Sequence, residues 1–174
     1  EIAQSQGPGF GRTTSTDGGL TFNDAAAAGA AGKTARAYLV KGQIDLGELG
    51  GGSVKGTVGG HFEKKDAGFS TLDEDIVNSQ TVWGLNAQIN ATDRTTVTAK
   101  YEYYKDSTGK SKQDASADVE FVMNSRWKAG IGVRHTALST PLGLPKENGS
   151  RTDVGMQVTW SPDEDRSLYA FGQV

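Results

Sequence analysis

Eight segments of the chain alternate apolar and polar residues with a period of two, and turn-rich breaks separate them. This is the alternation of β-strands, whose successive side chains point to opposite faces of a sheet. We therefore predict an all-β fold of antiparallel strands that follow one another up and down. The predicted strands are Tyr38–Leu46, Val54–Phe62, Val82–Asn90, Thr96–Tyr104, Ala115–Val122, Trp127–His135, Thr152–Trp160 and Ser167–Val174.

Short and long links alternate strictly between these segments. "ATDR" and "MNSR" are short, whereas "EKKDAGFSTLDEDIVNSQ", "KDSTGKSKQD" and "TALSTPLGLPKENGSR" are long. Outer-membrane barrels have short turns at the periplasmic rim and longer loops outside. Segments of about nine residues also match the length that a tilted strand needs to cross hydrocarbon. The rhythm predicts an up-and-down transmembrane β-barrel of eight strands, alone or as part of a larger barrel, with the loops around Asp73, Gly109 and Pro145 outside.

Residues 1–32 lack the alternation and contain "GPGFGRTTSTDGG" and the alanine-rich "NDAAAAGAAGKTA". They predict an irregular Gly/Ala-rich segment or loop, and residues 33–174 predict the barrel or a portion of one. No basic and apolar leader precedes Glu1, and no turn follows the final "LYAFGQV". We expect a processed product or a piece of a longer protein.

One face of the predicted strands carries no charged residue. A charge that faces the bilayer midplane costs roughly 2–4 kcal/mol, so contact with lipid requires such a face. The face consists of Tyr38, Val40, Gly42, Ile44, Leu46, Val54, Gly56, Val58, Gly60, Phe62, Trp83, Leu85, Ala87, Ile89, Val97, Ala99, Tyr101, Tyr103, Ala115, Ala117, Val119, Phe121, Trp127, Ala129, Ile131, Val133, Val154, Met156, Val158, Trp160, Leu168, Ala170, Gly172 and Val174.

The opposite face carries basic and acidic residues in similar numbers. In a soluble protein whose core is the apolar face, these charges would lie on the solvated surface. In a membrane barrel they line the inside, paired in a narrow lumen or hydrated in a wide one. The predicted lumen-lining residues are Lys41, Lys55, Lys100, Glu102, Asp118, Glu120, Lys128, Arg134, Arg151 and Asp153.

Aromatic residues stand at the ends of the predicted strands. Trp127 follows a short turn and Trp160 precedes one, so both fall at one rim, whereas Phe62, Trp83 and Tyr103 lie beside long loops at the other. Transmembrane barrels carry aromatic girdles at both membrane interfaces. These five residues are therefore the predicted lipid-interface aromatics, although aromatic residues favour strands in any protein.

Charge and composition exclude several classes of protein. A net charge of −3 over 174 residues gives no large field to attract nucleic acid. The chain has no cysteine, so it has neither disulfides nor a cysteine metal site. The mean hydropathy of −0.50 does not argue against a barrel, because half of each strand in a barrel can be polar.

No motif predicts catalysis. "DSTGKS" (Asp106–Ser111) resembles the end of a phosphate-binding loop, but Tyr104 stands where that loop needs a glycine. The acidic run Asp73–Asp75 matches no calcium-loop spacing. His61 and His135 are candidate bases, but no serine or carboxylate stands at a spacing that suggests a relay. We predict no enzyme, no metal and no other cofactor.

The segments "TVWGLNAQINATDRTTVTAKYEYYKD", "SRWKAGIGVRH" and "SLYAFGQV" resemble the barrel hairpins of large outer-membrane proteins of alphaproteobacteria. In that family, strand pairs around a "TDR"-like turn recur in a C-terminal barrel. The resemblance covers about Ala35 to Val174. It implies a location in the outer membrane of a Gram-negative cell envelope and a barrel of more strands than eight.

We expect a porin-like outer-membrane barrel that acts as a pore for transport or as a membrane anchor. Its expected partners are membrane lipid and further strands or subunits of a larger assembly, without nucleic acid. The alternative is a soluble β-sandwich, an adhesin-like surface module that binds a partner through its loops. The two hypotheses differ in what covers the apolar face, which is lipid in the first and protein in the second.

Overall fold

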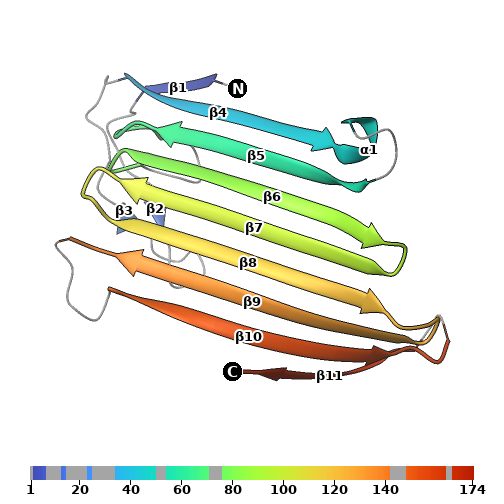
Figure 1. Cartoon of the computed structure of the whole chain (residues 1–174). Coiled ribbons are helices and arrows are strands. Elements are labelled where there is room, and N and C mark those ends of the chain that lie inside the picture. The colour runs from blue at the N-terminus through green and yellow to red at the C-terminus, as the bar shows by residue number, and fades with distance from the viewer. Residues whose placement is uncertain are drawn as a thin grey trace.

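In a computed structural model, nine antiparallel strands form one sheet (Figure 1). The structure describes residues 2–6, 13–14, 23–24, 34–49, 54–70, 76–141, 148–163 and 166–174. Two short strands, β2 (Thr13–Thr14) and β3 (Asn23–Asp24), pair separately, and α1 (Leu46–Leu49) is the one helix in these ranges. The large sheet holds, in spatial order, β1 (Ile2–Gln6), β4 (Thr34–Asp45), β5 (Lys55–Lys65), β6 (Gln80–Thr92), β7 (Thr95–Asp106), β8 (Ser111–Val122), β9 (Trp127–Ser139), β10 (Gly149–Trp160) and β11 (Leu168–Gln173).

The eight predicted strands are present as β4 to β11, and most are longer than predicted. Strands β6 and β9 have 13 residues each, against about nine expected from the pattern. Strand β8 begins at Ser111 rather than at Ala115, because its first residues pair with both β7 and β9 although they are polar. Every residue except proline has both a backbone donor and a backbone acceptor, so pairing continues beyond the end of the apolar pattern.

Strand β1 is a ninth strand that the alternation does not predict. It lies within residues 1–32, which we predicted to be irregular, and its sequence IAQSQ has only one large apolar residue. It pairs antiparallel with β4, from Ile2 opposite Tyr38 to Gln6 opposite Thr34. Strand β1 therefore forms because β4 offers it a backbone edge. Apart from β1, β2 and β3, the predicted irregular segment lies outside the described residues.

The predicted strict alternation of short and long links is wrong. Strands β7 and β8 extend into "KDSTGKSKQD" and leave only Ser107 to Lys110 between them, no more than the Met123 to Arg126 link between β8 and β9. The β5–β6, β7–β8 and β9–β10 links lie at one rim of the sheet, and the other links between β4 and β11 lie at the opposite rim (Figure 1). The predicted outer loops around Asp73 and Pro145 lie outside the described residues.

The β7–β8 turn is tight because the carboxylate of Asp106 closes it. Its Oδ1 accepts hydrogen bonds from the backbone N–H groups of Thr108 (2.9 Å) and Lys110 (3.1 Å). Gly109 has a φ of 89°, a conformation that glycine adopts without a steric penalty. The "DSTGKS" segment is thus a hairpin turn between antiparallel strands.

The register of the sheet places the predicted uncharged residues on one face, apart from Leu46, which lies in α1 because β4 ends at Asp45, and Val54, which precedes β5. Residues directly opposite each other on neighbouring strands share a face. One cross-strand row contains Val40, Phe62, Trp83 and Tyr103, and another contains Ile44, Val58, Ala87, Ala99, Ala117, Val133 and Val154. We call this face the apolar face and the other the polar face. The predicted separation of apolar and charged residues is confirmed.

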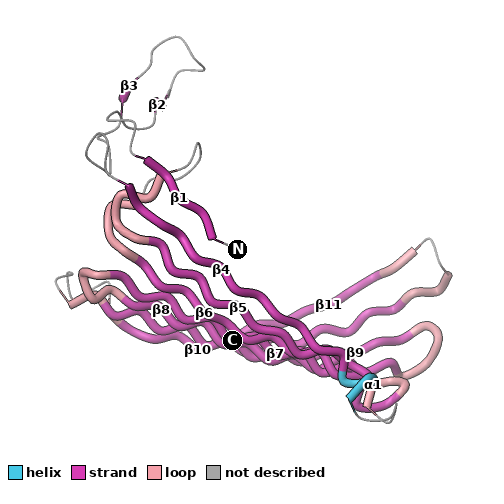
Figure 2. The backbone as a smooth tube through the Cα atoms, turned by 90° about the horizontal axis from the view of Figure 1, so that it is seen from above, coloured by secondary structure: helices cyan, strands magenta, loops and turns pink. Residues whose placement is uncertain are grey.

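The sheet is a single curved layer that is not closed (Figure 2). Strands β1 and β11 each pair on one side only, so a barrel remains a prediction. The sheet bends toward its polar face, which is hollowed in several places. Among the described residues, the buried apolar core consists only of Ala35, Ala37, Phe69 and Ile76. The sheet therefore has no second layer over its apolar face in the described part of the chain.

Candidate functional site

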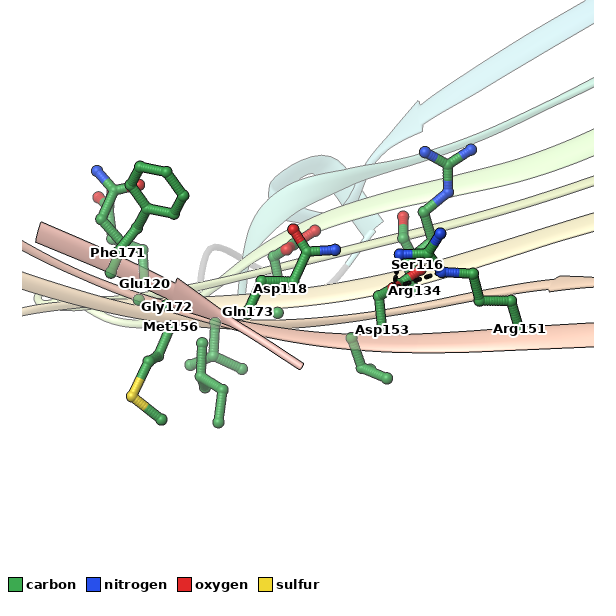
Figure 3. A pocket seen from close by; sticks show the side chains of 17 residues that line it. Ser116, Asp118, Glu120, Arg134, Arg151, Asp153, Met156, Phe171, Gly172 and Gln173 are labelled. Atoms are coloured by element: carbon green, nitrogen blue, oxygen red, sulfur yellow. Dashed lines mark hydrogen bonds and ion pairs between the residues drawn. The ribbon is translucent and has the colours of Figure 1, made fainter.

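The polar face brings together all ten predicted lumen-lining residues. Cross-strand pairing places Lys41 on this face beside His61, and Lys100 beside Ser116 and then Arg134. Figure 3 shows Asp118, Glu120, Arg134 and Arg151 on the polar side of the sheet and Met156 on the other side. The predicted assignment of these residues to one face is confirmed, whereas a lumen around them stays a prediction.

An ion-pair network centred on Asp114 lies on the polar face, toward the rim of the β7–β8 turn. Its carboxylate is 2.5 Å from Lys112 Nζ and 3.2 Å from the Arg134 guanidinium. The Thr136 hydroxyl donates a third interaction, a hydrogen bond of 2.5 Å to Asp114 Oδ1. Lys100 and Glu102 complete the wall of a small hollow beside this network. One carboxylate thus holds two cations and a hydroxyl in fixed positions.

Two further ion pairs flank the network. The Arg151 guanidinium donates to Asp153 Oδ1 through Nε (2.7 Å) and Nη2 (2.6 Å). Lys128 Nζ lies 3.7 Å from Glu120, and both side chains are more than half exposed. Exposed pairs of this kind contribute little to folding, so they mainly fix the positions of charges rather than the fold.

Sequence reasoning missed Lys112, Asp114 and Thr136. It began the fifth predicted strand at Ala115 and left Lys112 and Asp114 in a loop. The signal was available, because Lys112, Asp114, Ser116 and Asp118 continue the same period of two along β8. It was overlooked because the alternate positions Ser111 and Gln113 are not apolar.

The two histidines lie on opposite faces of the sheet. His61 stands opposite Lys41 and Gly84 on the polar face. His135 lies on the apolar face, where its Nδ1 is 2.8 Å from Thr152 Oγ1. The structure therefore does not bring these two candidate bases together.

The apolar face is exposed over most of the sheet. Ile44, Leu85, Ile131 and Val158, on four different strands, are 53%, 57%, 53% and 40% exposed. These residues would be buried against protein if the apolar face were the core of a sandwich. None of the described residues covers them, and contiguous apolar surface of this extent is rare on soluble monomers.

The apolar residues form a band that crosses the strands obliquely. On β6 and β7 the band reaches the row of Trp83 and Tyr103, but on β9 and β10 the next row inward already holds His135 and Thr152. The border of the band shifts by two rows between β4 and β10. This is roughly 13 Å along the strand direction over a distance of roughly 29 Å across the sheet. The border is therefore inclined by roughly 25° to the line perpendicular to the strands. Strands of membrane barrels are tilted by roughly 35–45° to the membrane normal, so a band of lipid contacts crosses them obliquely.

Aromatic residues mark two borders of this band. Trp83 lies 5.1 Å from Tyr101 and 5.9 Å from Tyr103 between ring centroids, near the rim of the β5–β6 link. Trp127 and Trp160 are cross-strand partners at the opposite rim, with ring centroids 6.2 Å apart. The predicted division of the aromatics between two rims is confirmed in the sheet, and their contact with lipid stays a prediction.

The described ranges contain no group of three or more His, Cys, Asp or Glu residues arranged to hold a metal ion. The acidic run Asp73–Asp75, considered above for calcium, lies outside them. They also contain no helix long and apolar enough to span a membrane.

Comparisons with known proteins identify no relative of this chain. No protein-family model, no curated protein and no solved structure matches the chain.

Proposed function

We propose that this sheet is the wall of a bacterial outer-membrane β-barrel, with its apolar band in contact with lipid and its polar face toward an aqueous lumen. The barrel serves as a pore for solutes or as a membrane anchor. The observation that carries the proposal is the exposed apolar band itself, which is continuous from β4 to β11 and carries aromatic residues at both borders. Lipid is the solvent that stabilises such a surface, because burial of apolar area in hydrocarbon is favourable.

The polar face suits a water-filled interior. It carries charges of both signs from β4 to β10, and many of these charges are paired, as in the Asp114 network. A soluble sandwich is less well supported, because it would bury the apolar face against a second sheet. Apart from the two-residue strands β2 and β3, the described part of the chain forms a single sheet.

Flotation with lipid vesicles tests the membrane contact. The full chain, folded in detergent and reconstituted, should float with phosphatidylcholine vesicles and resist extraction by urea. Ile131→Lys, at the centre of the band, should lower the stability of the inserted protein by roughly 2–4 kcal/mol. Thr98→Lys, on the polar face of β7, is the matched control and should insert like the wild type. Equal behaviour of the two variants, or a wild type that stays in the aqueous fraction, would contradict the proposal.

Planar-bilayer recordings separate the two roles. Stepwise conductance from the reconstituted protein supports a pore, because a water-filled lumen passes ions. Insertion without conductance at any voltage supports an anchor and excludes the pore.

A further inference from the structure

Two aromatic side chains of β11 lie on the polar face, where contact with lipid does not explain them. Tyr169 and Phe171 of β11 stand opposite Thr159 and Gln157 and are 67% and 73% exposed. Their ring centroids are 6.3 Å apart and the ring planes differ by only 30°. Exposed rings are poorly solvated, and on a hollowed polar surface they commonly supply the apolar wall of a ligand site.

Phe171 lines a hollow of the polar face with a volume of about 790 Å³. Two adjacent cross-strand rows form the part of the hollow beside Phe171. The labelled side chains of these rows, Asp118, Glu120, Phe171 and Gln173, rise on one side of the sheet (Figure 3). From β8 to β11, one row contains Glu120, Gly130, Gln157 and Phe171, and the other contains Asp118, Gly132, Gly155 and Gln173.

Glycines make the floor of the hollow. A Cβ atom on Gly130 would come no closer than 3.7 Å to another atom, the carbonyl oxygen of Val119. A Cβ atom on Gly155 would come no closer than 3.8 Å, to the carbonyl oxygen of Gly172. At Gly132, by contrast, the Asp118 carboxylate occupies the space that a Cβ atom would take, so the open floor lies over Gly130 and Gly155. The walls on β8 and β11 are three strand spacings apart, roughly 14 Å, which accommodates one or two sugar rings lying along a row.

The walls offer complementary chemistry. Phe171 presents an apolar ring, and the amides of Gln157 and Gln173 can both donate and accept hydrogen bonds. The carboxylates of Asp118 and Glu120 accept hydrogen bonds from hydroxyl groups. Asp118 makes no ion pair within the described ranges, and the Glu120–Lys128 pair is long, at 3.7 Å. Both carboxylates thus keep acceptor capacity.

We infer that this hollow binds a saccharide of one or two rings, which stacks the C–H face of a pyranose on Phe171 and donates hydroxyl hydrogens to Asp118 and Glu120. A pyranose has an apolar face and a rim of hydroxyl groups, which matches a ring on one wall and acceptors on the other. If the polar face lines a channel, the hollow would be a binding site for a sugar that passes through that channel. In this respect the inference deepens the proposed function.

Saturation-transfer NMR on the full detergent-folded chain tests the inference, because it detects weak binding without requiring insertion into a membrane. The probes are glucose, maltose and cellobiose, with tetramethylammonium as a cationic competitor. We expect transfer to the C–H protons of at least one saccharide at about 10 mM, in the range of millimolar Kd values. Phe171→Ala and Gly130→Leu, which remove the ring and fill the floor, should each weaken the signal at least about tenfold.

Two matched variants control for folding. Phe62→Ala removes an aromatic ring from the apolar face, and Gly42→Leu adds a side chain where a Cβ meets nothing within 4 Å, also on the apolar face. Both should keep the wild-type saccharide signal. Absence of transfer in the wild type, equal loss in all four variants, or transfer from tetramethylammonium alone would overturn the inference. Vesicle flotation of the same preparation tests the proposed membrane contact separately. A failure of the proposed function is therefore distinguishable from a failure of saccharide binding.

Discussion

Across strands β8 and β9, the Thr136 hydroxyl donates a hydrogen bond of 2.5 Å to the carboxylate of its cross-strand partner Asp114. The same carboxylate faces the ammonium of Lys112 and the guanidinium of Arg134. Its side chain is 22% exposed, about as much as that of Asp153 at 21%, but Asp114 holds two cations and a hydroxyl, whereas Asp153 pairs with one cation, Arg151. Asp114 is therefore the residue whose loss should disturb the polar face most.

We expect Asp114→Ala to lower the free energy of unfolding by about 1–2 kcal/mol, because two cations and a hydroxyl lose a shared partner. Urea unfolding of the detergent-folded protein, followed by tryptophan fluorescence, measures this change. Asp163→Ala is the control, since its pair with Arg166 lies in an exposed link and should matter little. Equal losses in the two variants would show that the network does not stabilise the sheet.

Gly84 on β6 lies under the ring of His61. A Cβ atom at position 84 would come within 2.6 Å of His61 Cε1 and 2.9 Å of the backbone oxygen of Tyr101. The second contact cannot be relieved by a side-chain rotation, so Gly84→Ala should cost about 1–3 kcal/mol. Gly42→Ala, where the space is open, should cost little, as measured by the same unfolding curves. A Gly84→Ala variant as stable as Gly42→Ala would contradict this packing.

The β7–β8 turn depends on one carboxylate. Asp106→Ala removes the acceptor for the backbone N–H groups of Thr108 and Lys110 and should destabilise the protein by about 1 kcal/mol. Asp106→Asn keeps an acceptor oxygen and should retain most of the stability. Hydrogen exchange of the Lys110 amide provides a local measurement, and unchanged protection in the alanine variant would exclude this role.

The two aromatic borders predict depths in a membrane. Three variants would each keep one tryptophan, at position 83, at position 127 or, through Ile131→Trp, at position 131, with the other tryptophans replaced by phenylalanine. Their fluorescence should be quenched differently by lipids that carry bromine at different depths of the acyl chain. Trp83 and Trp127 should be quenched best by bromine near the headgroups, and the residue at position 131 by bromine near the chain ends. The same depth for all three would mean that the band does not span the bilayer.

The faces of the sheet could be predicted from the sequence because their signal is local. A period of two along each strand is enough to separate Ile131 from Arg134, and an error of a few residues at a strand end does not change the faces. The register then aligns most of the predicted apolar residues in cross-strand rows, such as the row of Val40, Phe62 and Trp83.

The centre of the polar site could not be predicted in the same way. The meeting of Asp114, Arg134 and Thr136 depends on which residues of β8 and β9 stand opposite each other and on side-chain rotamers. Strand β1 was missed for a related reason, because its formation depends on the edge that β4 presents rather than on its own residues. The alternation could have placed Tyr169 and Phe171 on the polar face, since they are the residues between Leu168, Ala170 and Gly172.

Strands β1 and β11 run in the same direction, because every one of the intervening neighbours reverses the chain and the sheet holds nine strands. If these two outermost strands met, the seam would be a parallel ladder with slanted hydrogen bonds, which is slightly weaker per residue than the antiparallel ladders elsewhere. A closed cylinder in which every pair of neighbouring strands is antiparallel requires an even number of strands.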